Sequence, residues 1–299
     1  MIAPTVLEQR SRLLQAIRSF FLSRQYIEVD TPIRQPILIP EAHIRPFSSD
    51  GWFLQTSPEL CMKRLLASGC SRIFQICHCF RRGEQGRLHQ PEFTMLEWYR
   101  TGWTYMELME ECEALVRWVL SRADLHPPAR GAHGQSRCDI HGPWIRMRVA
   151  EAFDRYAHIS VGEAVAGNQF EEILVTRIEP HLGRHAPVFL YDYPVEHGSL
   201  ARRKVDNPAI AERFELYIQG IELANGFSEL VDPVEQEQRF IEEAALVDCD
   251  DSQIPFKLLD ALHELDSAAG IALGIDRMLM ILLGADSIQE VVPFSPEDL

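Results

Sequence analysis

Hydrophobic and polar residues follow one another along this chain in patterns that predict both helices and strands. Residues 6–23 and 105–121 carry apolar side chains at helical spacing, with charged residues between them. Such spacing is typical of an amphipathic helix that buries one face. In the first segment the apolar positions include Leu7, Leu14, Ile17 and Phe21. We therefore expect two long helices packed against a core.

The middle of the chain changes to a pattern of strands. A β-rich run at 73–80 leads into a polar, glycine-containing loop at 81–90, and a second run follows at 92–99. Two such runs around a loop predict a β-hairpin. Side chains of a strand alternate between its faces, so one face of the second strand carries, in order, Phe93, Met95, Glu97 and Tyr99. With Arg81 and His89 on the loop, this face suits a long ligand that has a planar base, a phosphate and an ammonium group.

Other segments add shorter elements. Pro58 and Glu59 suit the first turn of a helix, because proline and an acidic residue are favoured there. Residues 187–193 predict a buried strand, and residues 144–184 a short strand with two helices. Residues 126–137 lack any periodicity and predict a loop.

Two segments near the C-terminus carry candidate chemistry. Residues 213–230 predict two short strands that end in the turn-forming Asn225-Gly226. Residues 270–284 predict a glycine-rich strand that turns into an apolar helix, with Arg277 in its first turn. A cation there opposes the helix dipole and needs an anionic partner beside a buried face. That partner is either a bound triphosphate or the neighbouring Asp276.

Composition and charge narrow the class of protein. Of 299 residues 46% are hydrophobic, which allows one large domain or two ordinary ones. The 44 acidic residues outnumber the 29 basic ones, for a formal charge of −15. Such a surface repels phosphate backbones, which disfavours non-specific binding of nucleic acid. The one dense basic run, Arg202-Arg203-Lys204, is either a solvated loop or a docking site.

The cysteines and the termini indicate a reducing, intracellular setting. Seven irregularly spaced cysteines form no disulfide framework. Cys77-His78-Cys79 could suggest a metal cluster, but no matching Cys or His pair follows downstream. No signal peptide is evident, and the most apolar segment, at 271–284, is too short to span a membrane. We expect a cytoplasmic protein with no membrane partner.

Three segments together resemble one enzyme class. The run FRRGEQGRLHQPEFTMLEWY at residues 80–99 closely resembles motif 2 of the class II aminoacyl-tRNA synthetases, in the lysine branch. A pattern of this length is far more specific than a short glycine motif. The helix at 6–23 with the strand before Pro32 resembles motif 1, the dimer interface of that class, and residues 270–284 resemble motif 3. The resemblance implies an α+β fold, a class II synthetase-like mixed, mainly antiparallel sheet flanked by helices, in a single catalytic domain of residues 1–299 that forms a homodimer.

The resemblance also implies a site for ATP, Mg²⁺ and an amino acid. It assigns ATP binding to Arg81, His89, Phe93 and Arg277, with Arg81 and Arg277 catalytic. It assigns Mg²⁺ to Glu215 and Glu222, since hard cations prefer carboxylate oxygens. It places in the amino-acid pocket Glu59, Glu97, Tyr99, Asn225, Glu229 and Ala272. Without the resemblance, Glu59 would be an ordinary helix-start carboxylate, and the glutamates of 213–230 a solvated sheet face.

The chain departs from the lysyl-tRNA synthetases in three respects. The motif 1 helix begins within the first ten residues, so we expect no anticodon-binding domain before it. Ala272 replaces the second glycine of motif 3, and Gly83 replaces the usual glutamate of motif 2, with Glu84 displaced by one position. The first two departures resemble the elongation factor P lysine ligases, which are paralogues of the lysyl-tRNA synthetases.

This second resemblance implies a specific reaction. ATP would activate (R)-β-lysine, or lysine, as an acyl-adenylate, and a lysine side chain of the protein substrate, elongation factor P, would accept the acyl group. Phe93 would stack the adenine, and His89 and Arg277 would hold the pyrophosphate. No tRNA is expected to take part. Two alternatives stay open: a minimal enzyme that charges tRNA, and a paralogue that acts by binding alone.

Overall fold

The computed structural model describes residues 2–125, 138–198, 200–246, 254–295 and 298–299. The loop predicted at 126–137 lies outside these residues. Among the described residues, no helix combines the length and the apolar character that a membrane crossing requires.

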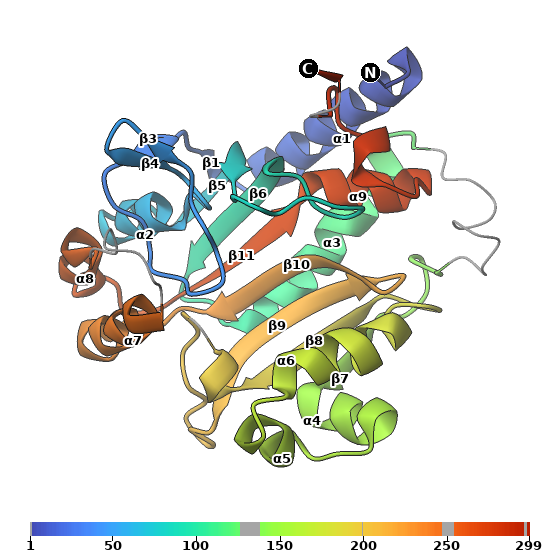
Figure 1. Ribbon diagram of the computed structural model, residues 1–299. Coiled ribbons are helices and arrows are strands. Elements are labelled where there is room, and N and C mark those ends of the chain that lie inside the picture. Colours follow the sequence, from blue (N-terminus) through green and yellow to red (C-terminus); the bar gives the residue numbers. More distant parts are fainter. Residues whose placement is uncertain (1, 126–137, 199, 247–253, 296–297) are drawn as a thin grey trace.

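A sheet of eight strands forms the centre of the molecule (Figure 1). In spatial order its strands are β1 (Ile27–Glu28), β5 (Arg72–Phe80), β6 (Glu92–Thr101), β11 (Ala268–Gly274), β10 (Ile221–Ser228), β9 (Ile210–Ile218), β8 (Val188–Pro194) and β7 (Ile145–Arg148). Neighbouring strands are antiparallel except at the two edges, where β1 pairs with β5 and β7 with β8 in parallel. A small second sheet joins β2 (Arg34–Gln35), β4 (Trp52–Leu54) and β3 (Ser48–Ser49). The mixed, mainly antiparallel sheet predicted from the resemblance is confirmed.

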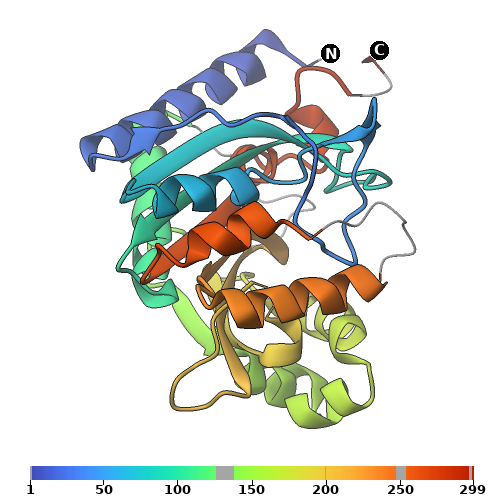
Figure 2. The same ribbon diagram turned by 90° about the vertical axis from the view of Figure 1, so that its left-hand side faces the viewer.

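Helices cover the sheet on one face and at one end. The longest, α1 (Pro4–Ser23) and α3 (Tyr105–Arg122), share a hydrophobic cluster with α9 (Ile275–Leu283) and with one face of the central strands, which contributes Phe74, Trp98, Phe214 and Ile271. At one end of the sheet α2 (Glu59–Ala67), α8 (Phe256–Leu262) and α7 (Pro233–Leu246) lie side by side (Figure 2). The opposite face of the central strands is left for the cavity described below.

The hairpin and both long helices lie where the pattern of apolar residues predicted them. The strands β5 and β6 agree with the predicted runs to within two residues, and α3 starts at the predicted residue. Thr104 caps α3, because its hydroxyl accepts from the backbone N–H of Met106 while the Glu107 carboxylate accepts from that of Thr104. Residues 144–184 differ from the two helices predicted there. They form β7 and three short helices, α4 (Val149–Ala152), α5 (Val161–Ala166) and α6 (Phe170–Ile173), with π and 3₁₀ turns between them.

The turn predicted at Asn225-Gly226 is wrong. Both residues lie inside β10, and the chain turns instead at Gln219 and Gly220, which adopt φ angles of 58° and 75°. Gly226 has a packing role, since a Cβ atom there would lie 2.7 Å from the Phe214 ring. The sequence signal for a turn is therefore the signature of a close approach between neighbouring strands.

Candidate active site

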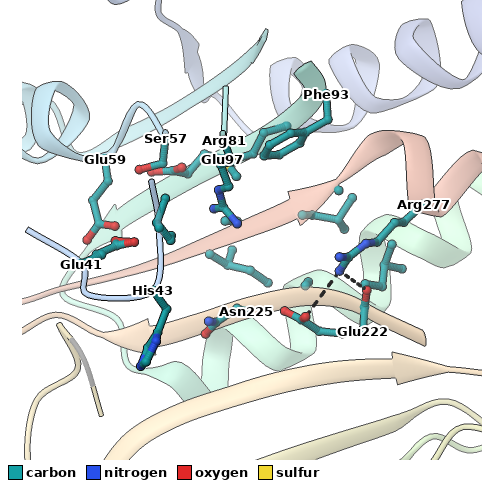
Figure 3. A pocket seen from close by; sticks show the side chains of 18 of the residues that line it. Glu41, His43, Ser57, Glu59, Arg81, Phe93, Glu97, Glu222, Asn225 and Arg277 are labelled. Atoms are coloured by element: carbon teal, nitrogen blue, oxygen red, sulfur yellow. Dashed lines mark hydrogen bonds and ion pairs between the residues drawn. The ribbon is translucent and has the colours of Figure 1, made fainter. Parts of the chain in front are cut away.

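A cavity of about 410 Å³ opens over the face of β6, β11 and β10 that points away from α3 (Figure 3). Most of the residues predicted to form the site line it: Glu59, Arg81, His89, Phe93, Glu97, Tyr99, Glu222, Asn225, Ala272 and Arg277. Two predicted residues, Glu215 and Glu229, do not line it. The sheet thus brings together side chains from segments that are up to about two hundred residues apart, as antiparallel pairing of non-consecutive strands allows.

The register of the strands fixes the floor of the cavity. Glu97 on β6 pairs with Ala272 on β11, which pairs with Asn225 on β10. Directly opposed residues point to the same face, and adjacent strands lie about 4.8 Å apart. Ala272 therefore occupies the centre of the floor, between a carboxylate and a carboxamide.

A β-bulge aims Glu222 into the same cavity. The pairing between β9 and β10 shifts by one residue between Glu222 and Ala224. Plain alternation would place Glu222 and Asn225 on opposite faces, because three positions separate them. The extra residue at the bulge puts both on the cavity face, since their partners Tyr217 and Glu215 are two residues apart.

Positive charge gathers at the end of the cavity next to Phe93. Arg81 lies over the Phe93 ring, with its guanidinium carbon 5.2 Å from the ring centroid. Arg277 donates to the backbone carbonyl of Glu222 at 2.9 Å and to His89 Nε2 at 2.6 Å, and its Nη1 lies 3.4 Å from Glu222 Oε2. Burial, and then the charge of Arg277, lowers the pKa of His89. His89 is therefore neutral near pH 7 and can accept the hydrogen bond.

Asp276 is not the partner of Arg277, although it precedes it in sequence. Asp276 Oδ1 forms an ion pair with Arg10 on α1 at 2.6 Å, and its Oδ2 accepts from the backbone N–H of Thr94 at 2.7 Å. Arg10 also donates to the Thr94 hydroxyl at 2.7 Å. This network joins the segments that resemble motifs 1, 2 and 3, and it leaves Arg277 directed at the cavity.

Gly83 and Glu84 form part of the loop beside Arg81. Gly83 adopts a φ angle of +85°, which favours glycine. Glu84 follows it, lines the cavity, and places Oε1 3.8 Å from Arg81 Nη1. The glutamate displaced by one position in the sequence thus still reaches the cavity.

Carboxylates gather at the opposite end of the cavity. Lys63 on α2 forms ion pairs with Glu59 at 2.5 Å and with Glu229 at 2.6 Å, and all three side chains are largely buried. Burial raises the pKa of Glu229 to about 8, although the Lys63 ammonium opposes this rise. Burial alone would lower the pKa of Lys63, but the two carboxylates raise it. Lys63 therefore stays protonated, and its ion pair with Glu229 attaches α2 to the carboxylate end of the cavity.

Glu97 and Tyr99 form a second buried pair at this end. The Tyr99 hydroxyl donates to Glu97 Oε1 at 2.5 Å. Glu97 Oε2 is also buried and has no hydrogen-bond partner among the residues that the structure describes. Burial, and then the nearby Glu59 charge, raises the pKa of Glu97 well above its ordinary range. A cationic group in the cavity would satisfy this oxygen and favour the ionised carboxylate.

Glu215 lies opposite Asn225 and points to the same face of the sheet, but it is buried and does not line the cavity. Its Oε1 pairs with Arg213 at 2.5 Å, and its Oε2 accepts from the hydroxyls of Tyr193 and Tyr217, each at 2.6 Å. Arg213 in turn lines the cavity and donates to Asn225 Oδ1. Both Glu215 oxygens thus have partners, and Glu215 supports Arg213; its predicted contact with Mg²⁺ stays a prediction.

Of the two carboxylates predicted to bind magnesium, Glu222 is the one that lines the cavity. Within the described part of the chain, no three His, Cys, Asp or Glu side chains converge as a metal-binding group. Mg²⁺ bound with a nucleotide needs only one or two protein carboxylates, because phosphate oxygens and water complete its shell. Glu222, with its side chain 38% exposed to the cavity, meets this requirement. Cys77 and Cys79 are buried beside Met95 on the cavity face of the sheet, and His78 points to the other face, where it pairs with Glu92, so these three residues do not converge.

Sequence reasoning missed four charged residues of this region. They are Arg10, Glu41, Lys63 and Arg213. Lys63 carried a usable signal, because it stands four residues after Glu59 at an apolar position of a helix. Arg10 and Glu41 have neighbours on distant segments, and Arg213, although it pairs with Glu215 on the same strand, shows no local pattern that places it in the cavity.

Comparison with known proteins agrees with this geometry. A model of the tRNA synthetases class II (D, K and N) matches residues 3–298. A Salmonella gallinarum (strain 287/91 / NCTC 13346) protein named elongation factor P–(R)-beta-lysine ligase is 38% identical over 304 residues, which cover 96% of this chain and 94% of that protein. Proteins of the same name from Salmonella paratyphi B (strain ATCC BAA-1250 / SPB7) and Salmonella schwarzengrund (strain CVM19633) are each 38% identical over 308 residues, with the same coverage.

The three motifs, the antiparallel sheet that carries them and an identity of 38% over nearly the whole chain lead to one assignment. The chain belongs to the class II tRNA synthetase (D, K and N) family and, within it, to the group of the elongation factor P–(R)-beta-lysine ligases.

Proposed function

We propose that this protein uses ATP to activate (R)-β-lysine, or lysine, and transfers the acyl group to a lysine side chain of elongation factor P. The names of its relatives support the protein substrate and the amino acid. The observation that carries the proposal is the division of charge in the cavity, with arginines at one end and an excess of carboxylates at the other.

The arginine end suits the triphosphate of ATP. Phe93 offers a ring on which adenine can stack. Arg81, Arg277 and neutral His89 supply donors for the phosphate oxygens. Glu222 would hold Mg²⁺, which neutralises part of the phosphate charge when it is bound.

The carboxylate end suits a substrate with two ammonium groups. Glu41, Glu59, Glu97 and Glu229 lie near only one lysine, Lys63. Carboxylates crowded in a buried site repel one another, and two ammonium groups would relieve that repulsion. A neutral or acidic amino acid would leave the excess charge unbalanced.

The first half-reaction joins the two ends of the cavity. A carboxylate oxygen of the amino acid attacks the α-phosphorus of ATP, an acyl-phosphate bond forms, and the bond to pyrophosphate breaks. Arg81 would stabilise the charge that develops on the α-phosphate, and Arg277 with His89 would hold the departing pyrophosphate.

In the second half-reaction the acceptor amine attacks the acyl carbonyl, an amide forms and AMP leaves. The amine has an ordinary pKa near 10.4 and gives up a proton during the attack. A lysine side chain is long and thin enough to reach the adenylate through the mouth of the cavity.

Transfer to tRNA receives less support. The formal charge of −15 opposes the approach of a phosphate backbone. The one dense basic run is already neutralised, because Arg202 pairs with Glu212, Arg203 with Glu235 and Lys204 with Asp192, at 2.6 to 2.8 Å.

Pyrophosphate exchange tests the proposal directly. Purified protein with ATP and Mg²⁺ should exchange labelled pyrophosphate in the presence of (R)-β-lysine, and α-lysine should be measured beside it. The activated acyl group should then appear on elongation factor P and not on tRNA. Absence of exchange with both amino acids, or efficient acylation of bulk tRNA at physiological salt, would refute the proposal.

A further inference from the structure

Glu41 is a carboxylate of the cavity that neither the motifs nor the predicted site includes. It lies in the irregular segment between β2 and β3, which crosses the mouth of the cavity. Figure 3 shows its carboxylate facing that of Glu59, from the opposite wall. Among the described residues, no hydrogen bond or ion pair reaches the Glu41 carboxylate, whereas Glu59 is paired with Lys63.

The backbone holds Glu41 in this position. Its carbonyl oxygen accepts from the backbone N–H of Ile44 at 3.2 Å, which closes a turn. The next residue, Ala42, donates its backbone N–H to Glu243 Oε2 on α7 at 2.8 Å. The segment is thus attached to a helix, and Glu41 faces the cavity without support from any cation bonded to it.

The electrostatic surroundings place Glu41 at a particular point along the cavity. The pKa of Glu41 is raised to about 7, first by burial and then by Glu59, while Arg81 and Lys63 lower it. Glu41 lies beside Glu59 in the cavity that Arg81 also lines (Figure 3), whereas Glu229 does not line it.

The structure of the substrate indicates which of its two ammonium groups would lie near Glu41. The reacting carboxylate of the amino acid has to lie next to Arg81 and the α-phosphate, so the ammonium group nearest that carboxylate falls between Arg81 and the deep end of the cavity. The distal ammonium group then lies deeper in the cavity, where it reaches Glu97 Oε2 near the Tyr99 hydroxyl. In lysine and β-lysine the nearer ammonium is the group that sits on a different carbon.

We propose that Glu41, together with Glu59, binds the ammonium group nearest the reacting carboxylate, and that Glu41 thereby helps to select a diamino acid by the position of that group. This inference rests on the proposed function, and it names a substrate contact outside the three motifs. The single positive charge of Lys63 neutralises only one of the two carboxylates, Glu59 and Glu229, with which it forms ion pairs. The Glu41 carboxylate has no cation bonded to it among the described residues, so it is available to bind an additional cation.

Three ligands separate the contacts of the two ammonium groups. (R)-β-Lysine has both groups, β-aminohexanoic acid keeps only the nearer one, and ε-aminocaproic acid keeps only the distal one. Their dissociation constants can be measured by titration calorimetry on wild-type protein and on Glu41→Gln, which removes the charge at constant size. The matched control is Glu196→Gln, which removes the same charge from an exposed residue at the cavity wall.

Glu41→Gln should weaken (R)-β-lysine and β-aminohexanoic acid by about 10- to 100-fold, the size expected for one hydrogen bond to a charged group. ε-Aminocaproic acid should bind as before, Glu196→Gln should bind all three like wild type, and Glu41→Asp should recover part of the loss. An equal loss for ε-aminocaproic acid, an equal loss in Glu196→Gln, or no loss for (R)-β-lysine would overturn the proposal.

The same variants separate this inference from the proposed function. If wild-type protein shows the expected binding pattern but no pyrophosphate exchange, the activity is refuted and the role of Glu41 stands. If exchange with (R)-β-lysine proceeds but Glu41→Gln leaves its KM and kcat unchanged, the role of Glu41 is refuted and the activity stands. A thermal melt of each variant confirms that the fold is retained.

Discussion

Arg277 shows how a single side chain can be prepared for an anion before the anion arrives. Its guanidinium donates to a neutral histidine and to a backbone carbonyl, and its contact with the Glu222 carboxylate is long, at 3.4 Å. Replacement of Arg277 or Arg81 by Ala should therefore reduce pyrophosphate exchange by about 100-fold or more, because each stabilises developing or departing phosphate charge. The control is Arg12→Ala, which removes an exposed arginine of α1. Near-normal exchange in either cavity variant would show that its arginine has another role.

Ala272 offers a second test at the scale of one residue. It lies between Glu97 and Asn225 on the cavity floor, where we propose that its methyl group contacts the substrate. A difference of one methyl group is worth about 10- to 200-fold in discrimination. Ala272→Gly should raise activation of α-lysine by about that factor, with little gain for (R)-β-lysine. Exchange rates that rise together for both amino acids, or no change for α-lysine, would assign Ala272 to packing alone.

Residues of the site differ in how far the sequence predicts them. Phe93, Glu97 and Tyr99 follow from strand alternation and from their place in a long motif. Glu41 does not, because its neighbours come from other segments and its own segment is irregular, and Arg213 does not, because an Arg-x-Glu pair on a strand is equally typical of a solvated face. The sequence did not predict that two tyrosines and an arginine enclose the Glu215 carboxylate, and the assignment of Glu215 to a metal stays a prediction.

Elements were predictable where one physical pattern dominated. The hairpin and the two long helices bury one face each, so their apolar residues recur with a clear period. Residues 144–184 pack as short turns, each too brief to show a period. The turn at Asn225-Gly226 was predicted wrongly because glycine is favoured both in turns and where strands pack closely. The neighbours of Gly226 in the folded structure, and not its neighbours in sequence, distinguish the two cases.

The attachment of α2 to the sheet leads to a prediction about stability. Lys63→Met would leave Glu59 and Glu229 buried without their cation. Removal of one partner from a buried ion pair typically costs about 3–5 kcal/mol. Denaturant unfolding should show a loss of this size, whereas Lys257→Met, on the exposed face of α8, should change stability by less than about 0.5 kcal/mol. A small loss in Lys63→Met would mean that the two carboxylates take up protons at little cost.

For the molecule as a whole, the crowded carboxylates predict how stability depends on pH. The pKa values of Glu41 and Glu229 rise to about 7 and about 8. A carboxyl whose folded-state pKa is raised contributes stability at low pH that is lost as the pH rises through that pKa. Between pH 6.5 and 8.5 the ligand-free protein should therefore melt at a lower temperature as pH rises, by about 2 °C or more.

The cation in the substrate should reverse this trend. Saturating (R)-β-lysine favours the ionised carboxylates, so the melting temperature should depend less on pH when the ligand is present. In Glu41→Gln the slope of the ligand-free protein should also become smaller. A melting temperature that is constant or rises across this pH window without ligand would contradict the charge distribution assigned to the cavity.

The predicted homodimer remains to be tested at the same scale. Leu22, Ile27 and Ile33 are each at least 45% exposed in the segment that includes the end of α1 and the edge strand β1. An open sheet edge with apolar neighbours favours pairing with another chain. Analytical ultracentrifugation should show a dimer at micromolar concentration, and Ile27→Lys should shift it toward the monomer. A monomeric wild-type protein at that concentration would exclude the dimer.

The bulge in β10 makes the active site sensitive to chain length as well as to side-chain identity. If Leu223 stayed and the bulge were lost, plain alternation would turn Glu222 toward the hydrophobic layer, whereas deletion of Leu223 would leave Glu222 two positions from Asn225 and on the same face. Relatives with one residue fewer between these two positions should therefore lack the bulge and still direct a carboxylate into the cavity, so the length of this short stretch and its backbone geometry have to change together.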